Sequence, residues 1–182
     1  MIKNFFILIL VILFLTFGGC LPWWEEPTQT ITFDNFQIDI PENYNQIRGE
    51  MIDNKQITNK IVKAYRHPER NDFRENLIIS STNLDGINSR EFSEVNLNKL
   101  NRKMWGININ ENTSHNPGCT AVEEGFYTHM EVYENIFDEN PSYYLSQYYI
   151  VKWNTWYIIS MASDEEWKKD EFQQYLTSLR CQ

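Results

Sequence analysis

The stretch Phe33-Asp-Asn-Phe-Gln-Ile-Asp-Ile-Pro41 opens the folded part of the chain and decides how it begins. Within it Phe36, Ile38 and Ile40 alternate with polar residues, and a proline comes next. A period of two is typical of a strand with one buried face, and a proline ends such a strand because it lacks the N–H group that pairing needs. We therefore expect the folded domain to begin with a strand at residues 31–40.

Strand-like segments recur along the chain. Residues 58–66 and 75–82 predict two more strands, and alternation resumes after residue 107, with long aromatic-rich segments at 142–152 and 156–162. Consecutive strands joined by short turns favour an antiparallel sheet.

The segment 126–133 divides its side chains between two faces. One face carries Phe126, Thr128, Met130 and Val132, and the other carries Tyr127, His129, Glu131 and Tyr133. We expect the face with His129 to be exposed to solvent.

Two further segments have the period of an amphipathic helix. Residues 89–105 follow Asn88, with Glu91 three residues later, which predicts a capping box. A second helix is expected at 164–180, capped in the same way by Ser163. The sequence thus predicts an α+β fold, in which an antiparallel sheet of about six or seven strands packs with two amphipathic helices.

The N-terminus has the pattern of an export signal. Lys3 precedes an almost unbroken apolar run from Phe5 to Phe17, and two glycines lead to Cys20. The end of this segment, Leu15-Thr-Phe-Gly-Gly-Cys20, resembles the lipobox of bacterial lipoproteins, in which the Cys thiol receives a diacylglycerol and becomes the first residue after cleavage. Phe17 departs from that pattern, since an aliphatic residue is usual there.

The lipobox resemblance implies a signal peptide at 1–19, a lipid-anchored tether at 20–30 and a folded domain at 31–182. It also implies a location in the cell membrane or outer membrane, outside the cytoplasm, with the lipid on Cys20 as the membrane contact. An uncleaved N-terminal membrane helix and a secreted product without an anchor stay open as alternatives.

Charge argues against nucleic acid as a partner. The chain has 16 basic and 25 acidic residues, a formal net charge of −9, and no cluster of Lys and Arg. Contacts with phosphates need such clusters, and anionic lipid headgroups should be repelled by the domain itself.

The chain has three cysteines. With Cys20 assigned to lipid, Cys119 and Cys181 remain as an even pair, which in an exported protein predicts a disulfide. Two unpaired thiols are the alternative.

The order of elements, together with the phrase Phe33–Pro41 and the Glu-Asn-Tyr44 that comes after it, resembles the PsbP-like or DcrB-like superfamily. The aromatic strand Trp156-Tyr-Ile-Ile-Ser-Met-Ala162, succeeded by a helix, fits the same pattern. The resemblance implies accessory lipoproteins or periplasmic proteins without known catalysis, some of which assist membrane complexes such as photosystem II.

Chemical motifs are scarce. His67, His115 and His129 lie far apart in sequence, and the chain has no Gly-x-Ser-x-Gly elbow, phosphate-binding glycine loop or His-Glu-x-x-His. We therefore predict no catalytic residues, no metal site and no cofactor.

The predicted function is a non-enzymatic binding or accessory module of the cell envelope, with an envelope protein or a glycan as its partner. Trp153 and Trp156 flank a turn and form a candidate binding surface, so a glycan-binding module is an alternative. An envelope hydrolase is a third, to be favoured if a deep polar pocket holds a His beside a Ser or Asp.

Overall fold

The computed structural model describes residues 27–47, 60–68, 75–83, 86–103, 106–115, 125–135, 137–152 and 155–181. The strands of a seven-stranded antiparallel sheet lie in the order β3 (Asn45–Gln46), β4 (Lys60–Arg66), β5 (Asn76–Asn83), β9 (Thr155–Ser163), β8 (Tyr143–Lys152), β7 (Gly125–Tyr133) and β6 (Gly106–His115). A three-stranded sheet contains β1 (Thr28–Phe33), β2 (Phe36–Pro41) and β10 (Arg180–Cys181). The helices are α2 (Ser89–Lys103) and α3 (Lys168–Thr177).

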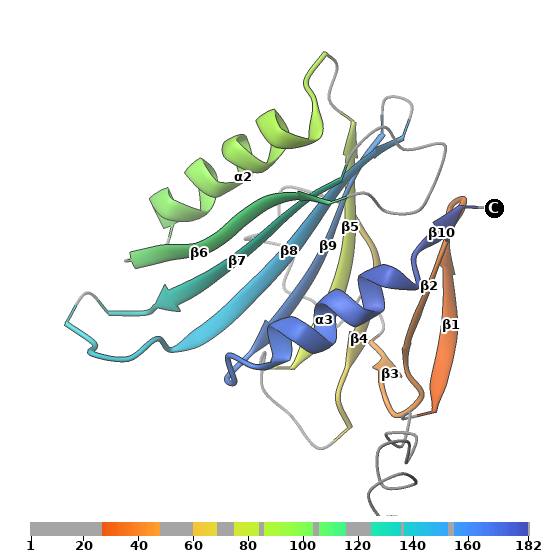
Figure 1. Ribbon diagram of the computed structural model, residues 1–182, viewed down its shortest axis with the longest axis horizontal. Coiled ribbons are helices and arrows are strands. Elements are labelled where there is room, and N and C mark those ends of the chain that lie inside the picture. The colour runs from red at the N-terminus through yellow and green to blue at the C-terminus, as the bar shows by residue number, and fades with distance from the viewer. Residues whose placement is uncertain are drawn as a thin grey trace, which may run out of the picture.

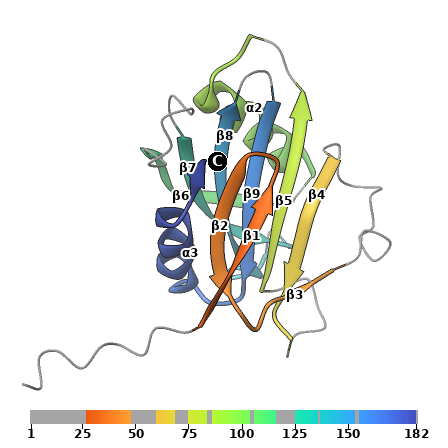
Figure 2. The ribbon, with the colours of Figure 1, turned by 90° about the vertical axis from the view of Figure 1, so that its right-hand side faces the viewer.

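The large sheet lies between two layers (Figure 1). Helix α2 covers one face, over β7 and β8, while α3 and the small sheet stand side by side over the other face (Figure 2). The expected α+β fold, with an antiparallel sheet and two amphipathic helices, is confirmed. Because both faces are covered, polar residues on either face of the central strands can be buried, as Thr128, His129, Ser146 and Gln147 are.

The core between the large sheet, α3 and the small sheet is the larger one. Its members from the hairpin, from α3 and from the residues just after α3 are Ile31, Phe33, Phe36, Ile38, Ile40, Phe172, Tyr175, Leu176 and Leu179. They meet Leu77, Ile79, Tyr148, Ile150, Tyr157 and Ile159 of the sheet. Burying a side chain of this size stabilises the fold by about 1.5–3 kcal/mol, so this layer fixes α3 and the hairpin on the sheet.

On the opposite face, α2 is held by apolar contacts and by a buried polar network. Phe92 packs 4.7 Å from the ring of Trp156, measured between centroids. Asn96 donates from Nδ2 to Gln147 Oε1 at 3.1 Å and to Tyr149 Oη at 2.9 Å. Tyr149 donates in turn to Gln147 Oε1 at 2.6 Å. The two bonds from Asn96 favour this position of α2, because they join the helix to polar groups that are buried on the sheet.

The segment expected as one strand at residues 31–40 is a hairpin. Asp34 has a φ of 47°, in the left-handed region that Asp tolerates in turns, and the chain reverses there. Phe33 and Phe36 then stack with ring centroids 5.4 Å apart, both buried. The spacing of the two phenylalanines is consistent with this turn. On one continuous strand, residues three apart would point to opposite faces, whereas both rings lie in the same core.

The two helices differ in how well the sequence predicts their starts. The capping box of α2 is confirmed: Glu91 N donates to Asn88 Oδ1 at 2.9 Å, and Asn88 N donates to Glu91 Oε2 at 3.0 Å. Helix α3 begins at Lys168 instead of 164, and Ser163 ends β9, where its Oγ accepts from Glu165 N at 3.0 Å. The expectation that Ser163 caps α3 is wrong, because pairing with β8 extends β9 through Ser163.

The last described residues close the small sheet. Strand β10 pairs with β2, so that Cys181 lies opposite Phe36 and Arg180 opposite Gln37. Ser178 links the end of α3 to the same strand, because its Oγ accepts from Asp39 N at 2.8 Å and donates to Tyr175 O at 2.6 Å. Within the part of the chain described above, neither helix has the length and apolar character needed to cross a bilayer.

Candidate functional site

A polar cluster lies on the large sheet beside α3. It consists of Tyr127 and His129 of β7 and Tyr144 and Ser146 of β8. The register of the two strands places His129 directly opposite Ser146. His129 is only 1% exposed, so the expectation of a solvent-facing histidine is wrong. The cause is the second covering layer, in which Phe172 of α3 packs beside the Tyr127 ring, 6.2 Å away between centroids.

His129 and Ser146 are within hydrogen-bond distance. The Nδ1 atom of His129 lies 2.9 Å from Ser146 Oγ, and Tyr127 Oη donates to the same oxygen at 3.4 Å. The imidazole ring stacks on Tyr144 with centroids 5.9 Å apart and planes 6° from parallel. The other ring nitrogen, Nε2, is buried and has no hydrogen-bond partner among the described residues. The imidazole is therefore held by Ser146 at Nδ1 and by the ring of Tyr144, while Nε2 adds no hydrogen bond among the described residues.

Burial keeps the His129 imidazole neutral. Removal from solvent lowers the pKa of His129 below its ordinary value of 6.5, and the positive charge of Lys169 lowers it further. Glu166, Glu131 and Asp170 act in the opposite direction without overcoming the effect of burial. A neutral imidazole next to a serine hydroxyl is the pair from which serine hydrolases build a nucleophile and its base.

The rest of the arrangement does not suit hydrolysis. A catalytic serine must be reached by substrate, whereas Ser146 is 4% exposed. A catalytic histidine is also oriented by a carboxylate on its second nitrogen, and no described residue holds Nε2. The Ser146–His129 pair is therefore a buried polar contact between two strands.

At the edge of the cluster nearest β6, the carboxylate of Glu131 has three hydrogen-bond donors. Glu131 accepts hydrogen bonds from Asn110 Nδ2 at 2.9 Å, Asn108 Nδ2 at 3.0 Å and Tyr133 Oη at 2.9 Å. Bonds from Asn110 first and then Asn108 lower the pKa of Glu131 below its usual value. Glu131 is thus a fixed negative charge on this part of the sheet.

The two tryptophans predicted as a binding surface do not form one together. Trp156 is 1% exposed, and its ring packs on Phe92 under α2. It belongs to the core, because α2 covers the face of β9 that carries it. Trp153 lies outside the described residues.

The predicted cysteine sites are largely beyond the described ranges. Cys20 and Cys119 lie outside them, and Cys181 lies in β10, half-buried against the core of the α3 side. Lipidation of Cys20 and the Cys119–Cys181 disulfide both stay predictions. Among the residues that the structure describes, no group of three His, Cys, Asp or Glu side chains is placed to hold a metal ion.

Sequence reasoning missed the Ser146–His129 pair. The two residues are 17 positions apart, and only the register of the β7–β8 hairpin brings them together. Alternation along β7 and β8 places both on the same face in principle, but the sequence does not fix which residues stand opposite each other.

Comparison with known proteins supports the fold. No family model matches the chain, and no curated protein sequence matches it. Among solved structures, the chain is similar to the solution structure of cyanobacterial PsbP (CyanoP) from Synechocystis sp. PCC 6803, with a TM-score of 0.63 and 11% sequence identity. The match covers 90% of this chain and 97% of that chain. At this identity the likeness shows the fold alone, and the expected PsbP-like fold is confirmed.

Proposed function

We propose that this chain is a membrane-anchored extracytoplasmic lipoprotein whose domain is a non-enzymatic binding or accessory module of the cell envelope. The lipobox-like segment ending at Cys20 supports the anchor. The PsbP-like fold is compatible with an accessory role, although a fold by itself does not specify a function.

The single observation that favours binding over catalysis is the enclosure of the Ser146–His129 pair. It has the residue types that the hydrolase hypothesis requires, yet the serine is buried and the second nitrogen of the histidine lacks an orienting carboxylate among the described residues. The glycan-binding alternative ranks lower, since Trp156, one of its two named residues, packs in the core.

Metabolic labelling with an alkyne analogue of palmitate tests the anchor. The full chain is expressed in a bacterium with lipoprotein-processing enzymes, beside a Cys20→Ser variant. We expect label in the parent and none in the variant, with the parent in the membrane fraction. Unlabelled parent protein recovered from the cytosol with its first 19 residues uncut would overturn the proposal.

Native electrophoresis of membranes solubilised in mild detergent tests the accessory role. We expect the anchored chain to migrate with a complex larger than the monomer, and a Ser146→Ala variant to migrate in the same way. Migration as a monomer only, or an esterase activity that Ser146→Ala abolishes, would contradict a non-enzymatic role.

A further inference from the structure

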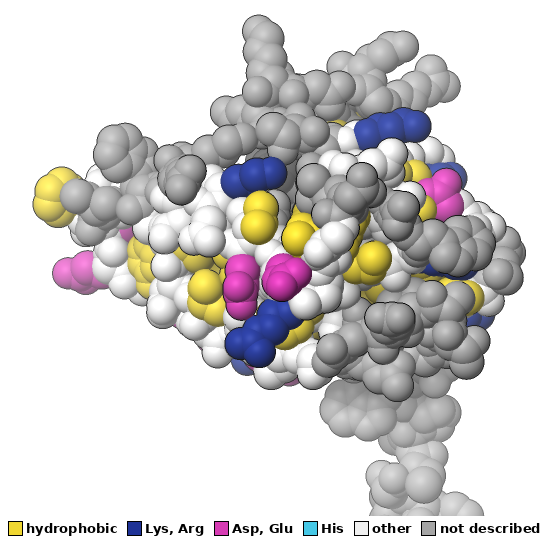
Figure 3. All heavy atoms as spheres, turned by 90° about the horizontal axis from the view of Figure 1, so that it is seen from above, with side chains coloured by type: hydrophobic (Ala, Val, Ile, Leu, Met, Phe, Trp, Pro, Cys, Tyr) yellow, Lys and Arg dark blue, Asp and Glu magenta, His cyan; other side chains and the backbone are white. Residues whose placement is uncertain are grey.

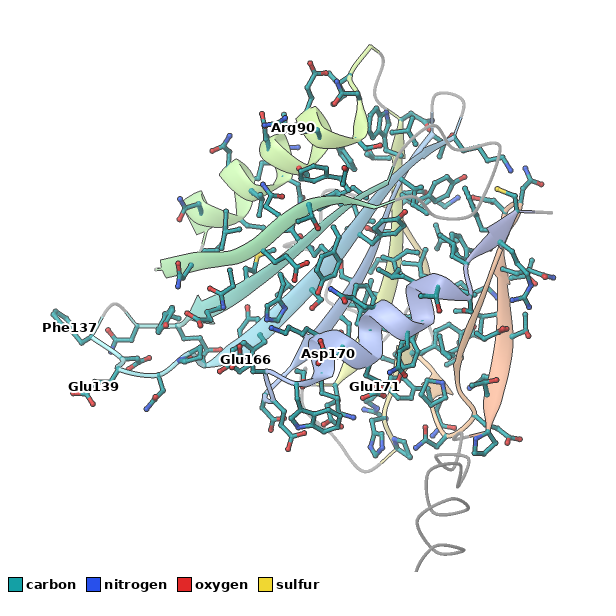
Figure 4. All side chains as sticks on the ribbon, in the orientation of Figure 1. Arg90, Phe137, Glu139, Glu166, Asp170 and Glu171 are labelled. Atoms are coloured by element: carbon teal, nitrogen blue, oxygen red, sulfur yellow. The ribbon has the colours of Figure 1, made fainter. Side chains whose placement is uncertain are left out.

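The β7–β8 connection projects beyond the large sheet and carries an exposed aromatic side chain. Figure 4 shows Phe137 and Glu139 at the tip of this connection, away from the body of the domain. Phe137 is 83% exposed, more than the other large hydrophobic residues on the described surface, of which Trp167 is next at 58%. Single exposed apolar residues are common on protein surfaces. The residues around Phe137 must therefore show whether it is a binding site.

Hydrogen bonds join the described residues of the tip, which are 134–135 and 137–142 of the segment 134–142. Asn135 accepts twice: its Oδ1 from Phe137 N at 3.2 Å and its backbone oxygen from Asp138 N at 3.1 Å. At the base, Glu134 N donates to Ser142 Oγ at 3.0 Å, and Ser142 N donates to Val132 O at 2.8 Å. A preformed turn loses little conformational entropy on binding, which is the property of an efficient anchor.

The residues near Phe137 in sequence include three acidic ones. Glu134, Asp138 and Glu139 are exposed on the tip, and residues 134–142 include no Lys or Arg. Figure 3 shows a hydrophobic and an acidic side chain standing apart from the rest at the left-hand end of the molecule. Aromatic anchors in protein interfaces fill pockets on the partner, and opposite charges around the pocket steer and orient them.

A membrane surface does not fit this chemistry. Loops that insert into bilayers combine apolar residues with Lys and Arg, because the lipid surface is anionic. The tip has the opposite charge, and the chain as a whole has a net charge of −9. Figure 1 also places the tip and β1, the first described strand in the sequence, at opposite ends of the long axis.

We propose that the β7–β8 tip docks Phe137 into an apolar pocket rimmed by Lys or Arg on a protein partner in the envelope. This inference rests on the proposed accessory role and specifies the surface and the partner chemistry. Phe137 supplies the buried anchor, while Glu134, Asp138 and Glu139 pair with the basic rim.

Site-specific photo-crosslinking in membranes tests the docking. The full chain carries p-benzoylphenylalanine in place of Phe137 or, as a control, in place of Trp167, which is also exposed but precedes Lys168, whose ammonium group lies over its ring. We expect a discrete protein adduct from position 137 and none of that mass from position 167. The crosslinked peptide should hold apolar residues beside Lys or Arg.

Charge reversal on the tip tests the proposed basic rim of the partner's pocket. With the crosslinker at 137, the double change Asp138→Lys and Glu139→Lys should reduce the adduct at least tenfold, whereas Asp138→Asn and Glu139→Gln should reduce it less. Thermal melts of all variants should agree within about 2 °C, because substitutions at exposed surface sites away from special features usually change stability by no more than ~0.5 kcal/mol.

Adducts to lipid only, a ladder of many products or no adduct would overturn the docking proposal. These outcomes are judged on protein that incorporates the palmitate analogue and fractionates with membranes, so a failure of the docking proposal is distinguishable from a failure of the anchor. An adduct that charge reversal leaves unchanged would also overturn the proposed basic rim.

Discussion

Arg180 donates two hydrogen bonds to the carboxylate of Asp39, one from Nη1 to Oδ2 at 2.9 Å and one from Nη2 to Oδ1 at 3.1 Å. Thr30 donates to the same carboxylate, at 2.6 Å from Oδ1. Since these residues belong to β10, β2 and β1, one carboxylate joins all three strands of the small sheet. Its bonds with Arg180 and then Thr30 hold the pKa of Asp39 below its ordinary value of 3.8.

We expect Asp39→Asn to lower the thermal unfolding midpoint at pH 7 by a small amount and to leave it unchanged in strong acid. A folded-state pKa below the unfolded one contributes stability above the unfolded pKa, and this contribution is lost as pH falls through the folded pKa. Melts of parent and variant from about pH 7 to about pH 2 should therefore converge as the pH falls below about 4. A gap that is the same at every pH would contradict this assignment.

We expect Gly125→Ala to destabilise the domain by about 1–3 kcal/mol. A Cβ atom on Gly125 would overlap the hydroxyl and ring of Tyr148, which is fully buried in the core and has little room to shift. Urea unfolding of the parent and variant measures the loss. Adding Tyr148→Phe should recover part of it by removing the hydroxyl, and no recovery would show that the overlap with the ring dominates.

We expect Asn96→Ala to cost about 1–3 kcal/mol, because it removes the donor to the buried Tyr149 Oη and one of the two donors to the buried Gln147 Oε1. The matched control is Asn98→Ala, a change of the same size at an exposed position of α2. The free energies of unfolding should differ clearly between the two variants. Equal, small effects would mean that the network adds nothing to the packing of α2.

We expect Trp156→Ala to destabilise the domain by about 3–5 kcal/mol and Trp167→Ala by less than about 0.5 kcal/mol. The first side chain is enclosed by the core under α2, and the second is mostly exposed. Denaturant titration of both variants decides the matter. A near-neutral Trp156→Ala that instead abolished binding to peptidoglycan would restore the glycan-binding hypothesis.

The strands and helices with strong periodicity can be predicted, because burial of one face dictates their pattern. Segments 75–82 and 142–152 correspond closely to β5 and β8, and Asn88 and Glu91 make the capping box that their spacing indicates. Phe172 and Leu176 of the second helix are also buried as expected. These features depend on local sequence, which is what a single sequence specifies best.

The features that the sequence does not predict depend on which strands pair and on which layers cover the sheet. Alternation identifies two faces of the strand that holds His129 without showing that a second layer covers both, so it wrongly predicts a histidine in solvent. Trp156 is in the core for the same reason. The exposure of Phe137 has no periodic signal in the sequence, because the residue lies in a turn between two strands.

The pairing of β10 with β2 means that one edge of the first hairpin is covered by a segment that lies far from it along the chain. A ribosome that stopped at residue 178 would release a chain in which β2 had a bare edge and Phe36 had lost a covering neighbour. Such a truncated product would be prone to pair with another copy through that edge.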